Sequence, residues 1–271
     1  MVDYRVLGPI EVHDATGPLS LPSGHPRRVL AVLLVNAGRP VAAEVLIDRL
    51  WGSEAPATAR AALQVHVSKL RRHLGASGTI RTTPAGYVLE VDGDDVDARR
   101  FEQAVREAQQ CVAGDPSRAV ALLDVADGHW RGVPYAEVAD EPWVASEVAR
   151  LTELRLAAAE VRSDADLQLG RHATSVDRLR AAAEEQPLRE RRWEQLMLAL
   201  YRSGRQAEAL RAFRQASQVL VEELGVEPGP ALRDLDRRIL LHDPSLDTSR
   251  HRPMQQANNI RISQGEKNDL L

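Results

Sequence analysis

The feature that most constrains the fold is the run from 58 to 74 (TARAALQVHVSKLRRHL), which combines an apolar stripe with a dense cationic face. Its apolar positions, Leu63, Val67, Leu70 and Leu74, are separated by four, three and four residues. Because this spacing aligns side chains along one side of an α-helix, it predicts an amphipathic helix whose stripe faces a core. The segments IRTT and YVLEV follow around a PAG turn, so the sequence places a β-hairpin directly after the helix.

The opposite face of this helix carries small, polar and cationic side chains, with which a helix can enter a DNA major groove. We assign five residues to base reading: Gln64, Val65, Ser68, Lys69 and Arg72. We assign a second set to phosphate contacts and to the wing: Thr58, Arg60, Arg71, His73, Arg81, Thr82, Thr83 and Tyr87. The alternative is a solvated basic face with no ligand, and the hairpin that follows favours DNA over it. For His66 we expect packing beneath the helix in preference to a phosphate contact.

The residues before this helix predict short strands and two further helices. Strands are expected around Gly8-Pro9 (4–12) and at 19–21, and Pro26 suits the first turn of a helix that ends at Gly38. A second helix follows over 42–52, and four of its residues are expected to face inward: Val45, Leu46, Leu50 and Trp51. The hydroxyl of Thr58 is a suitable N-cap for the basic helix. Strands, three helices and a hairpin together predict a winged helix-turn-helix over residues 1–93.

The charge of the chain is distributed unevenly between its two parts. Residues 1–93 carry 10 Lys and Arg against 8 Asp and Glu, whereas residues 94–245 carry 21 against 28. Only the first part is therefore suited to DNA. Its excess is small, so local clustering of cations on the basic helix has to supply the attraction. The wing tip, PAG, carries no cation.

Residues 97–245 predict an all-α array, because apolar residues recur at helical spacing in seven segments separated by Gly or Pro. The segment from 193 to 216 matches a tetratricopeptide pattern, with Trp193 and Leu196 in a first helix, Gly204 at the turn, and small residues where two helices approach. Such arrays favour protein binding over chemistry. The fold class is thus mainly α with small β-sheets: an N-terminal winged helix-turn-helix followed by a tetratricopeptide-like all-α helical array.

An aromatic segment joins two helices of this array and has two interpretations. Trp130, Tyr135 and Trp143 form either a ligand pocket or a plug that fills the junction between the helices, and we favour the plug.

Several functional classes lack support in the sequence. We find no motif for an enzyme, and we assign no catalytic residues, no metal site and no cofactor. The one cysteine excludes an intrachain disulfide and a cysteine-based metal cage. No apolar run reaches the ~18 residues that a membrane span needs, so we expect no membrane contact and a cytoplasmic protein. Residues 246–271 are polar and are expected to form a flexible tail.

Longer segments resemble a known family. VHVSKLRRHLG with TPAGYVLEV resembles the OmpR/PhoB type of DNA-binding domain. VLGPIEV, RRVLAVLLVNAGRPV and LIDRLWG resemble the Streptomyces antibiotic regulatory proteins (SARPs), which are related to AfsR, in their small form. DARRFEQAV, HWRGVPYAEVADEPWVASEVARLTELRLAAAE and GRQAEALRAFRQASQVLVEELGVEPGPALRDLDRRIL resemble the bacterial transcriptional activation domain of that family. The resemblance covers about nine tenths of the chain.

The resemblance implies a sequence-specific transcription activator. It would bind direct repeats in double-stranded promoter DNA near the −35 element as a side-by-side homodimer. It would recruit RNA polymerase through contacts that include the sigma factor, and its targets would be genes for secondary metabolites such as antibiotics. Two alternatives remain: a helical-repeat adaptor whose winged domain contacts only protein, and a regulator that senses a small ligand at the aromatic segment.

Overall fold

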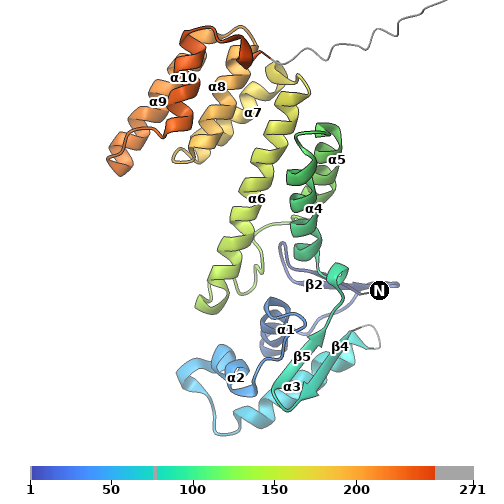
Figure 1. The fold of residues 1–271 in the computed structure, drawn as a ribbon. Helices are drawn as coiled ribbons and strands as arrows, with labels where there is room; N and C mark the ends of the chain where they lie inside the picture. The colour runs from blue at the N-terminus through green and yellow to red at the C-terminus, as the bar shows by residue number, and fades with distance from the viewer. Residues whose placement is uncertain (1, 76–77, 248–271) are drawn as a thin grey trace, which may run out of the picture.

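The computed structural model describes residues 2–75 and 78–247, and within these ranges it confirms a mainly α fold with small β-sheets (Figure 1). The strands are β1 (Asp3–Arg5), β2 (Glu11–Asp14), β3 (Gly17–Pro18), β4 (Thr79–Thr83) and β5 (Gly86–Glu90). The helices are α1 (His25–Val35), α2 (Ala43–Trp51), α3 (Ala59–Leu74), α4 (Asp97–Cys111), α5 (Pro116–Asp127), α6 (Pro142–Gln168), α7 (His172–Glu185), α8 (Glu190–Arg202), α9 (Gln206–Leu224) and α10 (Pro230–Leu240). None of the helices in the described ranges combines the length and the hydropathy that crossing a membrane requires.

The N-terminal sheet is antiparallel, in the order β1-β2-β3. The prediction of a strand at 19–21 is wrong, because the third strand consists only of Gly17–Pro18. Leu19 still donates its N–H to the carbonyl of Val12 at 2.8 Å, and the chain then leaves the sheet toward α1. Pro26 occupies the first turn of α1, as expected.

Helix α2 buries a narrower stripe than the sequence indicated. Leu46 and Leu50, one helical turn apart, are 0% and 4% exposed. Val45 was expected to face inward and is 42% exposed. The reason is geometric: Val45 lies ~100° around the helix from Leu46 and points away from the core.

Helix α3 and the β4–β5 hairpin form where the sequence placed them. Thr58 occupies the N-cap position of α3, but its hydroxyl accepts no capping hydrogen bond, because its backbone (φ −93°, ψ 11°) lacks the extended conformation of a capping residue. In the hairpin Thr82 pairs with Tyr87 across a two-residue turn. Tyr87 also exchanges two backbone hydrogen bonds with Val41, at 2.8 and 2.9 Å, which attach the hairpin to the segment before α2.

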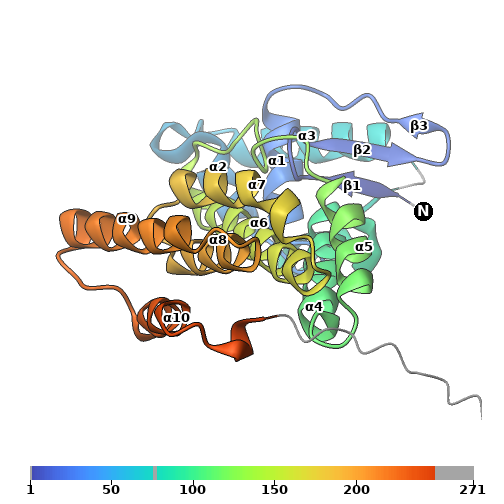
Figure 2. The ribbon, with the colours of Figure 1, turned by 90° about the horizontal axis from the view of Figure 1, so that it is seen from above.

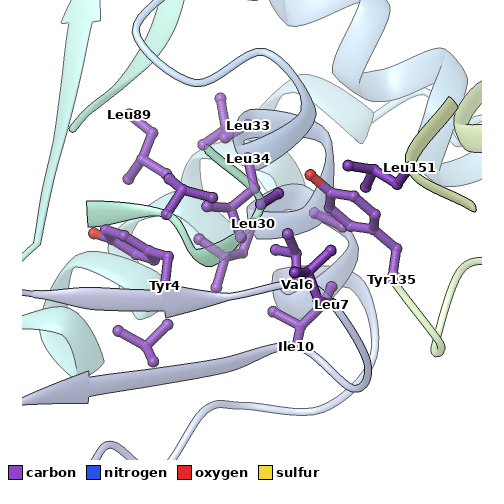
Figure 3. Close-up of a cluster of buried hydrophobic side chains, with 14 of the residues drawn as sticks. Tyr4, Val6, Leu7, Ile10, Leu30, Leu33, Leu34, Leu89, Tyr135 and Leu151 are labelled. Atoms are coloured by element: carbon purple, nitrogen blue, oxygen red, sulfur yellow. The ribbon is translucent and has the colours of Figure 1, made fainter. Parts of the chain in front are cut away.

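One hydrophobic core runs from the N-terminal sheet into the helical array. Figure 3 shows Val6, Leu7 and Ile10 beside side chains of α1, with Tyr135 and Leu151 closing the same cluster from the other side. Tyr135 is 2% exposed, and Trp130 and Trp143 pack against the same core. The aromatic segment is therefore a plug, as favoured from the sequence.

Backbone and carboxylate hydrogen bonds reinforce this junction. Tyr135 and Arg131 donate their N–H groups to the carbonyls of Val6 and Leu7, at 2.8 and 2.7 Å. The carboxylate of Asp97, which is 1% exposed, accepts the N–H groups of Val6 and Leu7 at 2.8 and 3.2 Å. The winged part and the first array helices are thus joined through both apolar and polar contacts.

The seven helices expected in the array are all present as α4 to α10. α6 is the longest, with 27 residues, and connects the first core to a second core built from α7 to α10 (Figures 1 and 2). In the tetratricopeptide-like pair α8–α9, Trp193 and Ala209 are 1% and 0% exposed. Leu246, assigned from the sequence to the tail, is 3% exposed in the second core, because this apolar residue ends a 3-10 turn (Pro244–Leu246) that folds back on the array. The remainder of the expected tail, 248–271, lies outside the described residues.

Candidate nucleic-acid interface

Helix α3 presents the residues assigned to base reading on an exposed surface. Leu63, Val67, Leu70 and Leu74 are at most 1% exposed, and α3 packs through them on α1 and α2. This burial turns the opposite face outward, and all five residues assigned to base reading are exposed: Gln64, Val65, Ser68, Lys69 and Arg72. Val65 is 64% exposed.

Arg71 has a structural role that the sequence assignment did not include. Its Nε donates to the carbonyl of Ile80 at 2.8 Å, and its Nη2 donates to the hydroxyl of Thr82, also at 2.8 Å. Arg71 therefore connects α3 to β4. Because these bonds fix the guanidinium beside the hairpin, a phosphate contact from Arg71 would have to be made by its remaining donors.

Two further cations are paired with carboxylates. Arg60 on α3 forms an ion pair with Glu44 on α2, and Arg81 forms one with Glu90 across the hairpin. All four side chains are at least 45% exposed, so each pair contributes only ~0–1 kcal/mol and can open toward a phosphate. Pairing leaves the local positive charge weaker than the count of basic residues indicated.

Lys69 and Arg72 differ from these cations. Within the described residues, neither side chain makes a hydrogen bond or an ion pair, and both are exposed. The two free cations therefore lie on the face that also carries Gln64 and Ser68.

The remaining assigned residues lie at the ends of α3 and in the hairpin. His73 is half-buried, and its Nδ1 hydrogen-bonds to the carbonyl of Lys69 at 2.8 Å. Thr83 donates its hydroxyl to the carbonyl of Gly86 at 3.1 Å and so closes the wing turn. Tyr87 is only 9% exposed, because its backbone pairs with Val41 and its ring joins the core. This burial leaves little of the Tyr87 side chain exposed for a contact with DNA.

Sequence reasoning missed the two acidic partners, Glu44 and Glu90. For Glu90 the sequence did contain a signal. Side chains alternate between the two faces of a hairpin, so around a two-residue turn Arg81 and Glu90 become diagonal neighbours on one face. For Glu44 there was none, because its approach to Arg60 depends on how α2 and α3 pack.

His66 lies in an aromatic cluster beneath α3. Its ring centroid is 5.4 Å from that of His25 and 5.9 Å from that of Trp51. Burial, together with the charges of His25 and Lys69, lowers the pKa of His66. The ring packs as expected from the sequence.

The lowered pKa of His66 predicts an acid-labile fold. Since the folded state disfavours the protonated ring, its contribution to stability is present above the unfolded pKa of ~6.5 and is lost as the pH falls below that value. We expect the free energy of unfolding, measured by urea denaturation, to decrease between about pH 7 and pH 5.5. His66→Phe keeps the ring contact and should reduce this decrease. An unchanged pH dependence in His66→Phe would contradict the assignment.

Two family models match the chain in consecutive segments. Residues 21–89 match the model described as "Transcriptional regulatory protein, C terminal", and residues 96–240 match the "Bacterial transcriptional activator domain". The first match runs from before α1 into β5, and the second contains the array from α4 to α10.

Curated relatives and a solved structure match most of the chain. It is 38% identical to the regulatory protein DnrI of Streptomyces peucetius, over 91% of this chain and 94% of that protein. It is 38% identical to the regulatory protein AfsR of Streptomyces griseus, over 90% of this chain but only 25% of AfsR. The structure of Mycobacterium tuberculosis EmbR in complex with a low-affinity phosphopeptide is 33% identical, with a TM-score of 0.84 over 90% of this chain and 66% of EmbR.

These matches cover both parts of the molecule, in the order in which the chain builds the exposed α3 and then the helical array. The chain belongs to the Streptomyces antibiotic regulatory protein family of transcriptional activators.

Proposed function

We propose that this chain binds promoter DNA by inserting α3 into the major groove. The observation that carries the proposal is the exposed face of α3, on which Lys69 and Arg72 have no partner among the described residues. Arg72 would read a base, since a guanidinium can donate two hydrogen bonds to one guanine. Arg60 and Arg81 would contact phosphates after their exposed ion pairs open.

The wing would contribute little to this affinity. Its turn, Pro84–Ala85, carries no charge, and Arg71 beside it is engaged with β4. We therefore propose that two copies bind side by side on direct repeats near the −35 element. The helical array would then recruit RNA polymerase and its sigma factor. The names and organisms of the relatives support genes for antibiotic or other secondary-metabolite pathways as targets, which would place the protein in the cytoplasm at the nucleoid.

Replacing Arg72 with alanine tests base reading. We expect cognate promoter DNA, found by footprinting the neighbourhood of the gene, to bind ~1 to 3 kcal/mol more weakly, with a relaxed preference at one base pair. Binding to a scrambled duplex should fall much less. Fluorescence anisotropy with both duplexes measures the difference. An equal loss of affinity for both duplexes would mean that Arg72 contacts a phosphate and does not read a base.

Arg60→Ala is the matched control on the same helix. It should weaken both duplexes equally and lower the slope of log affinity against log salt by about 1, because one phosphate contact is removed. Arg106→Ala, an exposed position on α4, should change neither quantity.

The two alternatives make different predictions. A protein adaptor would show no salt-dependent binding to either duplex. A ligand sensor at the aromatic segment would need an accessible Tyr135, and its 2% exposure argues against that site.

A further inference from the structure

A cleft of about 410 Å³ lies where α4, α5, α6 and α7 meet, away from α3. Its apolar floor is formed by Phe101, Leu123, Ala158 and Ala159. Phe101 stands edge-on against Trp130, with ring centroids 5.3 Å apart. The volume is that of a site for a small organic molecule.

The rim of this cleft is cationic although the array as a whole is acidic. Three guanidinium groups line it, from Arg155, Arg162 and Arg178, against the carboxylates of Asp124 and Asp127. Those two carboxylates are 57% and 71% exposed, so both can turn into solvent at little cost.

The arginines are incompletely neutralised by the protein. The buried carboxylate of Asp166 is shared by three guanidinium groups, at 2.9 Å from Arg178, 3.0 Å from Arg171 and 3.5 Å from Arg162. The Nε of Arg162, the atom that lies 3.5 Å from Asp166, is buried and makes no hydrogen bond among the described residues, and Arg162 pairs through its Nη1 with the exposed Asp124. Burial lowers the pKa of Arg178 although the neighbouring carboxylate of Asp166 opposes the shift.

The cleft is lined by residues on helices of both hydrophobic cores, so a ligand in it would contact helices of both. Phe101 and Leu123 belong to the first hydrophobic core, whereas Arg178 projects from α7, a helix of the second core. α6 carries the chain from one core to the other (Figure 1). A molecule that contacts the floor and Arg178 together would bridge the two cores.

We propose that this cleft binds a small amphipathic anion, a carboxylate with an apolar body, whose charge pairs with Arg155 and Arg178 while its body covers Phe101 and Leu123. Binding would fix α7–α10 relative to α4–α5. The proposal goes beyond DNA binding and does not depend on it, because the site lies on other elements.

The test measures binding of hexanoate to the purified full chain by NMR titration, with two matched probes. Hexan-1-ol has the same apolar body without the charge, and acetate has the carboxylate without the body. A ligand of about eight non-hydrogen atoms is expected to bind in the millimolar range. We expect hexanoate to bind at least about tenfold more tightly than either probe, because only hexanoate satisfies both the rim and the floor.

Variants locate the site. Arg178→Met removes the charge and keeps the stem, and Ala159→Trp fills the cleft from an exposed position; each should weaken hexanoate at least about tenfold. Arg178→Lys, which keeps a cation, checks that a loss in Arg178→Met does not reflect misfolding, and it should retain most of the affinity. Arg106→Met should leave binding unchanged. Absence of hexanoate binding, equal binding of hexan-1-ol or acetate, or full affinity in Ala159→Trp would overturn the proposal.

Discussion

Replacing Gly86 with alanine is expected to lower the free energy of unfolding by about 4 kcal/mol and to weaken DNA binding with it. Gly86 has φ +125°, and a Cβ built there would lie 2.0 Å from the carbonyl oxygen of Val41. Val41 exchanges two hydrogen bonds with Tyr87, so the hairpin cannot move away without breaking both. The loss combines ~1 kcal/mol for each bond with ~1–3 kcal/mol of backbone strain. Urea denaturation measures it.

Gly17 supplies the control for this prediction. Its φ of +123° is nearly that of Gly86, but nothing lies within 4 Å of a Cβ built there. Gly17→Ala should therefore cost only the strain, about 1–3 kcal/mol. Similar losses in the two variants would show that the close approach to Val41 contributes nothing to stability.

The parts of the interface that repeat regularly were predictable from the sequence. The stripe from Leu63 to Leu74 defined which side of α3 is buried, so the exposure of Ser68 and Arg72 followed from the helical period alone. The hairpin followed from two β-rich runs around a short turn, and the seven array helices followed from apolar spacing.

The pairings between elements were not predictable in this way. Arg71 was assigned to a phosphate because its type and position allowed it, but its bond to Ile80 depends on the angle between α3 and β4. Tyr87 was assigned to the wing surface, and the bridge to Val41 turned it inward. Local patterns carry no information about such contacts, since they depend on the packing of elements far apart in the chain.

Local patterns also separate residues 1–93 from residues 97–245 more sharply than the packing does. The change in charge and in apolar spacing near Asp95 marks two functional parts, and the family matches have the same order. The hydrophobic core, however, continues from β1 through α1 to α6. We infer that residues 2–75 and 78–165 unfold as one cooperative unit although they carry two kinds of surface.

Asp97→Ala is expected to destabilise this unit by about 3–5 kcal/mol. Asp97 begins α4 and is 1% exposed, and its carboxylate accepts the N–H groups of Val6 and Leu7 beneath Arg131, whose Nη2 lies 3.4 Å away. Alanine would leave both N–H groups buried without a partner, and each such group costs ~1–3 kcal/mol. Because burial raises the pKa of Asp97, the neutral Asp97→Asn, which still accepts one N–H, should lose less than Asp97→Ala.

Asp115→Ala is the matched comparison, since Asp115 is an exposed N-cap of α5 that accepts one N–H, from Arg118 at 3.0 Å. It should cost ~1 kcal/mol. Hydrogen exchange then distinguishes one unit from two. In Asp97→Ala, the protection of backbone N–H groups from exchange should fall by the same factor in α1 and in α5, because the hydrogen bonds of Asp97 lie between these helices within one core. Loss of protection in α1 alone would mean that the winged part unfolds independently. In a single unit, a substitution that loosens α4, α5 or α6 also loosens the support of α3, so DNA binding and the stability of these three helices would change together.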